Sequence, residues 1–372
     1  MKELTEDKGL RIQHFFQMLR YSIEASEEFP SELSPEMWND IYKIARQQSL
    51  LGVLFDGIHQ QTESKPPRDL LLKWYAISEQ IKEANQKTNK TAVEVSDFFR
   101  TQGFRTCILK GQGNTLHYPN PYIRTSGDID IWLEGGHDKI MKFVNSKWHG
   151  MLERYHHVEI PAWNGIPVEI HFTPSFMHAP WMNKRMQRWF AEQEEEQFSH
   201  CVALPNTEGM VCVPTLEFNL VYQLSHIYRH LFSEGIGLRQ IVDYYFLLKA
   251  KNDNEPQTMD HGELAATLQY LGLYKFAGAV MWVLKETLGL EEEYLIVPSN
   301  ERLGRFLLDE ILQGGNFGQY DTRLGSKEGE GIVHRYFRMS LRNMRYIMHY
   351  PLEALCEPLF RTWYFFWRVA HR

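Results

Sequence analysis

Two short segments in the middle of the chain place polar residues at alternate positions among β-branched residues. The first reads GDIDIWL and carries Asp128 and Asp130, and the second reads IPVEIHF and carries Glu169 and His171. Side chains two positions apart in a strand point to one face, so each segment presents its acidic residues together and buries its Ile and Val residues opposite. Neighbouring like charges repel each other, and burying them costs hydration energy. Both costs must be offset by a positively charged group between them. The pattern therefore predicts a sheet with a charged site on one face.

The surrounding chain predicts an α+β fold with a mixed sheet. Residues 101–178 contain short β-branched runs bounded by Gly, and HHVEIPAWNGIPVEIHFTP reads as two strands around the turn WNG. On both sides the pattern is helical. We expect an N-terminal helical region over 1–100, a core over 101–200 and a C-terminal helical domain over 201–372. The length of 372 residues agrees with two or three packed units.

Apolar residues recur every three or four positions in the flanking regions, which predicts amphipathic helices. Ser34 is the expected N-cap of one of them, with Pro35 at its first position. A helix is also expected to begin near Asn114, after the strand that ends at Leu109. The longer helices are expected at roughly 70–100, 216–231, 238–248, 264–288, 333–348 and 352–370.

Composition narrows the class of protein. A net charge of −7 gives no global attraction to nucleic acid, and no apolar run approaches the length that spans a bilayer. The acidic start MKELTEDKG lacks the apolar stretch of a signal peptide, so a cytoplasmic location is expected. Four cysteines without a CxxC pair predict reduced thiols, neither disulfides nor a structural zinc site.

Asp128 and Asp130 have two interpretations when taken alone. Paired carboxylates are what a hard divalent cation such as Mg²⁺ requires, but an edge strand with two solvated aspartates gives the same pattern. Glu169 becomes a third carboxylate over the same spot if its strand lies beside the first. The turn LKGQGN, with Lys110 and backbone amides at a helix start, suits a triphosphate, although its spacing matches neither a P-loop nor a dinucleotide fingerprint.

The order of these pieces resembles the nucleotidyltransferase superfamily with a polymerase-beta-like palm, and more closely the bacterial family of uncharacterised nucleotidyltransferases. The shared features are the LKG turn at 109–111, Arg124 followed by GDIDI at 127–131, the acidic-x-His strand at 169–171, and the helical block SHIYRHLFSEGIGLRQIVDYYFLL. The resemblance covers most of the chain. One departure is Gln112, which stands where the family's phosphate turn usually has Ser.

The resemblance implies a role for each matching residue. Asp128, Asp130 and Glu169 would be the catalytic residues and the metal ligands. His171 and His226 would be accessory residues. The nucleotide would be bound by Lys110, Gly111, Gln112, Gly113, Arg124, Arg239 and Asp243. An open alternative is that Arg239 and Asp243 belong to an interhelical ion-pair network, and that Arg124 pairs with a carboxylate and not with a phosphate.

The activity that the resemblance implies is a Mg²⁺-dependent, two-metal transfer of a nucleoside monophosphate from an NTP such as ATP to an acceptor, releasing pyrophosphate. Mn²⁺ is the alternative cation. A small-molecule acceptor is expected, with nucleic acid and protein left open, and no membrane span is expected. The alternative function is a non-catalytic nucleotide- or partner-binding relative. The basic, aromatic segment over 334–372 is expected to dock on the rest of the chain, with membrane-surface or nucleic-acid binding as alternatives.

Overall fold

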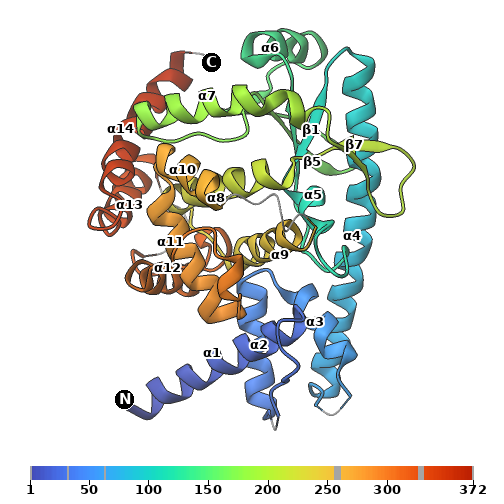
Figure 1. Ribbon diagram of the computed structural model, residues 1–372, viewed down its shortest axis with the longest axis vertical. Helices are drawn as coiled ribbons and strands as arrows, with labels where there is room; N and C mark the ends of the chain where they lie inside the picture. The colour runs from blue at the N-terminus through green and yellow to red at the C-terminus, as the bar shows by residue number, and fades with distance from the viewer. Residues whose placement is uncertain (1, 32, 63, 255–260, 326–330, 371–372) are drawn as a thin grey trace.

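The computed structural model describes residues 2–31, 33–62, 64–254, 261–325 and 331–370 (Figure 1). The N-terminal part contains the helices α1 (Lys2–Ser22), α2 (Pro35–Gln47), α3 (Leu51–Gln60) and α4 (Arg68–Thr101). The middle part contains β1 (Thr106–Leu109), α5 (Gly111–Thr115), β2 (Ile129–Leu133), α6 (Gly136–Lys147), β3 (Leu152–Glu153), β4 (His157–Trp163), β5 (Ile166–His171), α7 (Pro180–Gln197), β6 (Cys201–Ala203) and β7 (Met210–Cys212). The C-terminal part contains α8 (Leu216–Ser233), α9 (Leu238–Asn254), α10 (His261–Tyr270), α11 (Tyr274–Val283), η1 (Leu284–Leu288), η2 (Glu292–Tyr294), α12 (Glu301–Gly314), η3 (Asn316–Gly318), α13 (Ile332–Met344) and α14 (Pro351–Ala370).

Within the described residues, five strands form a mixed sheet in the order β1-β2-β5-β4-β3. The β2–β5 pair is parallel and the other pairs are antiparallel. The fold is therefore mixed α+β, as the sequence predicts. A smaller two-stranded sheet joins β6 to β7.

The two faces of the main sheet are covered by different helices (Figure 1). On one face, Ile129 and Ile131 belong to a hydrophobic cluster that includes Phe99 of α4 and Ile140 of α6. On the other face, Trp132 joins a larger cluster with residues of α7 and α8, and its ring lies 6.1 Å from that of Phe218. The alternation of the strand residues thus directs the polar side chains toward α8.

The turn WNG forms as the sequence predicts. Asn164 and Gly165 connect β4 to β5 with φ angles of 51° and 75°. Positive φ at both central residues is the geometry of the two-residue hairpin turn favoured by Asn-Gly. This turn, together with an irregularity between Ile160 and Trp163, sets the register of the two strands that carry the site.

The predicted helix boundaries hold at some places and fail at others. Ser34 caps α2, where its side chain accepts a hydrogen bond from the backbone amide of Met37. The single helix expected over 264–288 is wrong, because the chain breaks between α10 and α11. The break occurs at Gly272, whose φ of +74° ends a helix without the steric cost that a Cβ brings.

The expectation that every thiol is reduced is also wrong. Cys201 and Cys212 form a disulfide across the β6–β7 pair. The two cysteines are directly opposed in the strand register, and a spacing of 11 residues gave no sign of that register. Cys107 is buried and Cys356 is partly buried, and both thiols are free.

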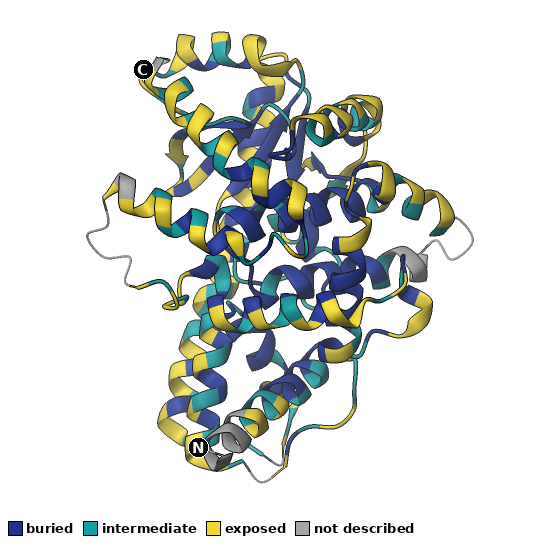
Figure 2. Ribbon diagram, turned by 90° about the vertical axis from the view of Figure 1, so that its left-hand side faces the viewer, coloured by how far each residue is buried: buried dark blue, intermediate teal, exposed yellow. Residues whose placement is uncertain are grey.

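Buried residues fill the middle of the molecule and exposed residues lie on the outer helices (Figure 2). Most described residues of α8 and α9 are buried. One hydrophobic cluster includes Phe15, Trp132 and Leu307, which come from all three predicted regions. The division at residues 101 and 201 therefore remains a proposal. Among the described residues, no helix combines the length and the apolar character that crossing a bilayer requires.

The C-terminal aromatic segment packs on the core through one side of α14. The ring of Phe360 lies 5.2 Å from Phe176 and 5.1 Å from Tyr155. Another side of α14 is exposed, at Leu359 and Phe366. Docking thus accounts for part of the aromatic content of this segment.

Candidate active site

The sheet register brings the acidic residues of separate strands into one row. Asp130 of β2 is the Cα partner of Glu169 of β5, and Glu169 is in turn the partner of Glu159 of β4. Paired residues in adjacent strands point to the same face. Asp130, Glu169 and Glu159 therefore lie side by side on the face that looks toward α8.

Asp128 lies one residue before β2, which begins at Ile129, so the expectation that both aspartates stand in the strand is wrong. The pairing of β1 with β2 stops at Leu109 and Asp130, and β2 begins one residue earlier, at Ile129. Asp128 is solvent-exposed but still interacts electrostatically with its neighbour. The charge of Asp130 raises the pKa of Asp128 to about 6, and Glu169 adds to this effect.

Asp130 is buried, and its carboxylate contacts two nitrogen-containing side chains. Its Oδ1 lies 2.9 Å from Lys110 Nζ and 2.9 Å from His171 Nε2. Burial by itself raises the pKa of this carboxyl group, but Lys110 and His171 outweigh burial and hold the pKa well below its usual range. Asp130 therefore carries a negative charge at neutral pH.

Glu169 lies between two imidazoles. Its Oε2 is 3.5 Å from His157 Nε2 and 3.6 Å from His171 Nε2. Burial lowers the pKa of His157 to about 3, whereas the pKa of His171 is raised because hydrogen bonds to Asp130 and Glu169 outweigh the opposing effect of burial. Carboxylates, imidazoles and the Lys110 side chain therefore lie together on this face.

The phosphate turn predicted at LKGQGN has an unusual backbone. Lys110 has φ 54° and ψ −145°, a conformation that non-glycine residues rarely adopt and that is typical of strained functional sites. The helix α5 then begins at Gly111, earlier than the predicted start near Asn114. Around Gly111 an added Cβ would meet only the backbone oxygen of Asp128, at 3.9 Å, so the turn offers an open face beside Asp128.

The other residues of this turn point into the protein. Gln112 is buried, and its amide group donates a hydrogen bond to Asn89 of α4. Gly113 allows close packing, since a Cβ there would lie 3.4 Å from Val213. The structure therefore commits the Gln112 side chain to α4, and only the backbone of Gln112 and Gly113 remains for the predicted binding role.

Arg124 and Asp243 form a buried ion pair. Arg124 donates to Asp243 from Nε at 2.7 Å and from Nη2 at 2.9 Å, and the hydroxyl of Tyr118 donates to the same carboxylate at 2.7 Å. Burial raises the pKa of Asp243, but Arg124 outweighs burial and lowers it below the usual value. Arg239 donates to the backbone oxygen of Thr125 at 2.9 Å. These contacts join α9 to the loop before β2, and Arg124 pairs with a carboxylate, which is the alternative that the sequence left open for it.

Helix α8 contributes a second basic group to this side of the sheet. Arg229 donates to His230 Nε2 at 3.1 Å and contacts His226 Nδ1 at 3.4 Å. Burial lowers the pKa of His226 well below its usual value, and the charges of Lys110 and His171 lower it further. His226 of α8 therefore lies near Lys110 and His171.

Three overlapping groups of residues bring possible metal-ligand atoms within 4.8 Å of one another. They are Asp130 with Glu169 and His171, His157 with Glu159 and Glu169, and His156 with His157 and His171. Among the described residues, none of these groups includes Asp128. The sequence pattern did not select His156 and His157 as ligands, because their proximity to His171 follows from the β4–β5 register and not from their spacing along the chain.

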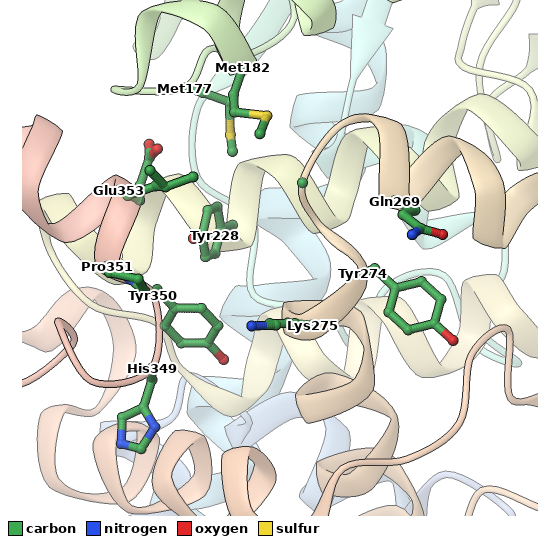
Figure 3. A pocket seen from close by; sticks show the side chains of 12 residues that line it. Met177, Met182, Tyr228, Gln269, Tyr274, Lys275, His349, Tyr350, Pro351 and Glu353 are labelled. Carbon is green, nitrogen blue, oxygen red and sulfur yellow. The ribbon is translucent and has the colours of Figure 1, made fainter.

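A separate pocket of about 520 Å³ lies away from the acidic row (Figure 3). Its lining comes from the segment around α7, from α8, from the α10–α11 connection and from the start of α14, and includes Met177, Met182, Tyr228, Lys275 and Glu353. Glu353 accepts a hydrogen bond of 2.8 Å from His178 Nδ1. None of the lining residues belongs to the acidic row, so this pocket is a different place from the candidate active site.

Comparison with known proteins gives one family. The sequence profile of a family described as "Uncharacterised nucleotidyltransferase" matches residues 34–289, which confirms the resemblance seen in the motifs. No curated protein matches the chain. Among solved structures, a similar one is an antigenic nucleotidyltransferase-like protein from Paracoccidioides brasiliensis, at 11% identity and a TM-score of 0.31. That match covers 61% of this chain and 98% of the other, and we draw nothing from a likeness of this size.

Proposed function

This chain belongs to the uncharacterised nucleotidyltransferase family, and we propose that it transfers a nucleoside monophosphate from an NTP to an acceptor group, releasing pyrophosphate. The observation that carries the proposal is the pairing of Asp130 with Glu169 across two strands, with Asp128 one residue before the first strand. The strained Lys110 turn lies directly beside them. We propose Asp128, Asp130 and Glu169 as the catalytic residues, and Lys110 with Gly111 as the phosphate-binding turn.

The electrostatics of these carboxylates fit a divalent cation. The pKa of Asp128 is raised to about 6, foremost by the charge of Asp130, and the opposing charge of Lys110 relieves only part of this repulsion. Oxygen ligands in this number suit Mg²⁺, and Asp128, Asp130 and Glu169 would hold it. When bound, a divalent cation neutralises the triphosphate and lowers the pKa of an attacking hydroxyl group.

The side chains around the acidic row would orient the substrates. Lys110 Nζ is 2.9 Å from Asp130, and this amine would exchange part of the contact for a phosphate oxygen when a nucleotide binds. Glu169 is half-buried, and its carboxylate can accept the proton of an acceptor hydroxyl group. His171 holds Asp130 in position through a hydrogen bond of 2.9 Å.

Arg124, Asp243 and Arg239 are the remaining residues predicted to bind the nucleotide, and their contacts suggest different roles. Arg124 and Asp243 are engaged with each other, so we propose that they order the loop before Asp128 and do not contact the nucleotide. Asn85 of α4 supports this arrangement by donating to the backbone oxygens of Tyr122 and Arg124. Arg239 contacts the same loop, because it donates a hydrogen bond to the backbone oxygen of Thr125. We propose that Arg239 binds the nucleotide.

The proposal is tested by incubating the full chain with Mg²⁺, a cell extract and each of the four NTPs labelled at the α-phosphate. We expect the label to become attached to one class of acceptor, with release of an equal amount of pyrophosphate. The variants Asp128→Asn and Asp130→Asn should lose this incorporation. Equal incorporation by the wild type and both variants would contradict the proposal, and binding of NTP without any transfer would favour the non-catalytic alternative.

A further inference from the structure

Three buried histidines lie together at the end of the β4–β5 hairpin. His156 precedes β4, His157 begins it, and His171 ends β5 as the Cα partner of His157. The ring centroids of His157 and His156 are 4.5 Å apart, and each of these rings lies 5.2 Å from that of His171. The exposed fractions of His156, His157 and His171 are 4%, 9% and 1%.

Hydrogen bonding leaves this group incomplete. His171 uses Nε2 to contact Asp130, while His156 Nε2 contacts His157 Nδ1 at 3.3 Å. Among the described residues, neither Nδ1 of His156 nor Nδ1 of His171 has a hydrogen-bond partner. Buried polar nitrogens are almost always paired in proteins, because an unpaired one forfeits the hydration it had in water. Two such atoms in one three-residue cluster indicate that a further ligand completes it.

The chemistry of the cluster indicates which ligand. Ligand atoms of the three histidines lie within 4.8 Å of one another, so they can converge on one ion. Imidazole nitrogen suits zinc and its neighbours among the transition metals, whereas Mg²⁺ prefers oxygen. The hydrogen bond between His171 and Asp130 is also typical of metal-binding histidines, whose second ring nitrogen commonly contacts a carboxylate.

We propose that His156, His157 and His171 form a site for a transition-metal cation of the zinc class, beside the carboxylates and distinct from the proposed Mg²⁺ site. The proposal does not depend on nucleotidyl transfer. His171 connects the two sites, because it belongs to the histidine cluster and contacts Asp130. The zinc-class cation would fix the end of the strand that carries Glu169.

The test is metal binding by the full-length chain, purified without a histidine tag and stripped with a chelator. The background variant Cys356→Ser removes a partly buried free thiol that could bind the probe. Co²⁺ is titrated in and followed by its visible absorption, and Zn²⁺ content is then measured by elemental analysis after gel filtration. We expect one tightly bound ion per chain, displaced by Zn²⁺ and not by a large excess of Mg²⁺.

Variants separate the cluster from other sites. His156→Gln and His157→Gln should each weaken Co²⁺ binding by about 100-fold or more, while the exposed His149→Gln should leave it unchanged. Asp128→Asn should retain the ion even though it loses transfer activity, so the two proposals fail separately. Circular dichroism and thermal melting establish that each variant is folded. If His156→Gln does not fold, His157→Gln alone gives the test. Unchanged binding in a folded cluster variant, or no Co²⁺ binding by the parent chain, would overturn the proposal.

Discussion

Two groups of charged residues flank the loop that leads into β2, and they differ in how completely their charges are satisfied. In the Arg124–Asp243 pair, the carboxylate accepts three hydrogen bonds, from two guanidinium nitrogens and from Tyr118. In the acidic row, Asp130 is paired with Lys110 and His171, but the neighbouring Asp128 has a raised pKa of about 6. The charge of Asp128 also acts on Arg124, so the two groups are near each other.

The difference separates a structural ion pair from a binding site. A buried charge whose hydrogen bonds are complete holds two elements together and has little capacity left for a ligand. A cluster with residual repulsion is less stable by itself and gains from a cation. Sequence alone did not distinguish the two groups, because each contains a carboxylate and a cationic side chain whose partners are far apart in the chain.

The largest expected effect is on activity, at Asp128. Replacing Asp128 with Asn should lower nucleotidyl transfer by about 10³-fold or more, since a metal-bound carboxylate supplies about 4 kcal/mol or more of transition-state stabilisation. The melting temperature should stay equal or rise, because the substitution removes a charge that the metal-free fold disfavours. Initial rates with labelled NTP and thermal melts measure the two effects. Asp309→Asn, an exposed change on α12, is the control and should alter neither.

The next largest effect is on stability, at the ion pair. Asp243→Asn leaves the Arg124 guanidinium buried without a charged partner, which should lower the free energy of unfolding by about 3 kcal/mol or more. Denaturant titration, monitored by tryptophan fluorescence, measures the free energy of unfolding. The exposed pair of Asp97 and Arg100 gives the matched control, and Asp97→Asn should cost at most about 0.5 kcal/mol. Similar small losses for both variants would show that the buried pair is not structural.

The same pair predicts a pH dependence. The folded-state pKa of Asp243 is lowered, so its contribution to stability is fully present above the unfolded value of about 3.9 and is lost as pH falls through the lower folded value. The stability difference between wild type and Asp243→Asn should therefore be constant from pH 7 to 5 and shrink toward pH 3. Urea unfolding at several pH values measures this difference. A gap that grows as the solution becomes more acidic would contradict the assignment.

The smallest expected effect is at the third hydrogen bond of the pair. Tyr118→Phe removes the hydroxyl donor to Asp243 and should lower the free energy of unfolding by about 1.5 kcal/mol, the usual worth of a hydrogen bond to a charged group. Its transfer activity should remain close to that of the wild type. Denaturant titration and the transfer assay together measure both quantities. A loss of activity without a loss of stability would contradict the structural role of Tyr118 and would indicate that Tyr118 belongs to the active site.

Parts of the fold and the site could be predicted from the sequence because they depend on local patterns. The alternation in IPVEIHF placed Glu169 and His171 on one face, and Asn164-Gly165 predicted the hairpin turn. Contacts between distant segments could not be predicted. The pairing of Arg124 with Asp243 spans 119 residues, and the Cys201–Cys212 bond depends on a strand register that the spacing does not reveal.

The sequence by itself determined the kinds of groups available: three carboxylates in or next to two strands, a Lys-Gly turn, and helices on both sides. Periodicity and turn chemistry are encoded over a few residues, so a single chain reveals them. The tertiary structure decided which groups meet. It set Glu169 beside Asp130, turned Gln112 toward α4, committed Arg124 to Asp243, and brought His156 and His157 against His171. Those outcomes depend on strand register and helix docking, which are fixed by the packing of the whole core.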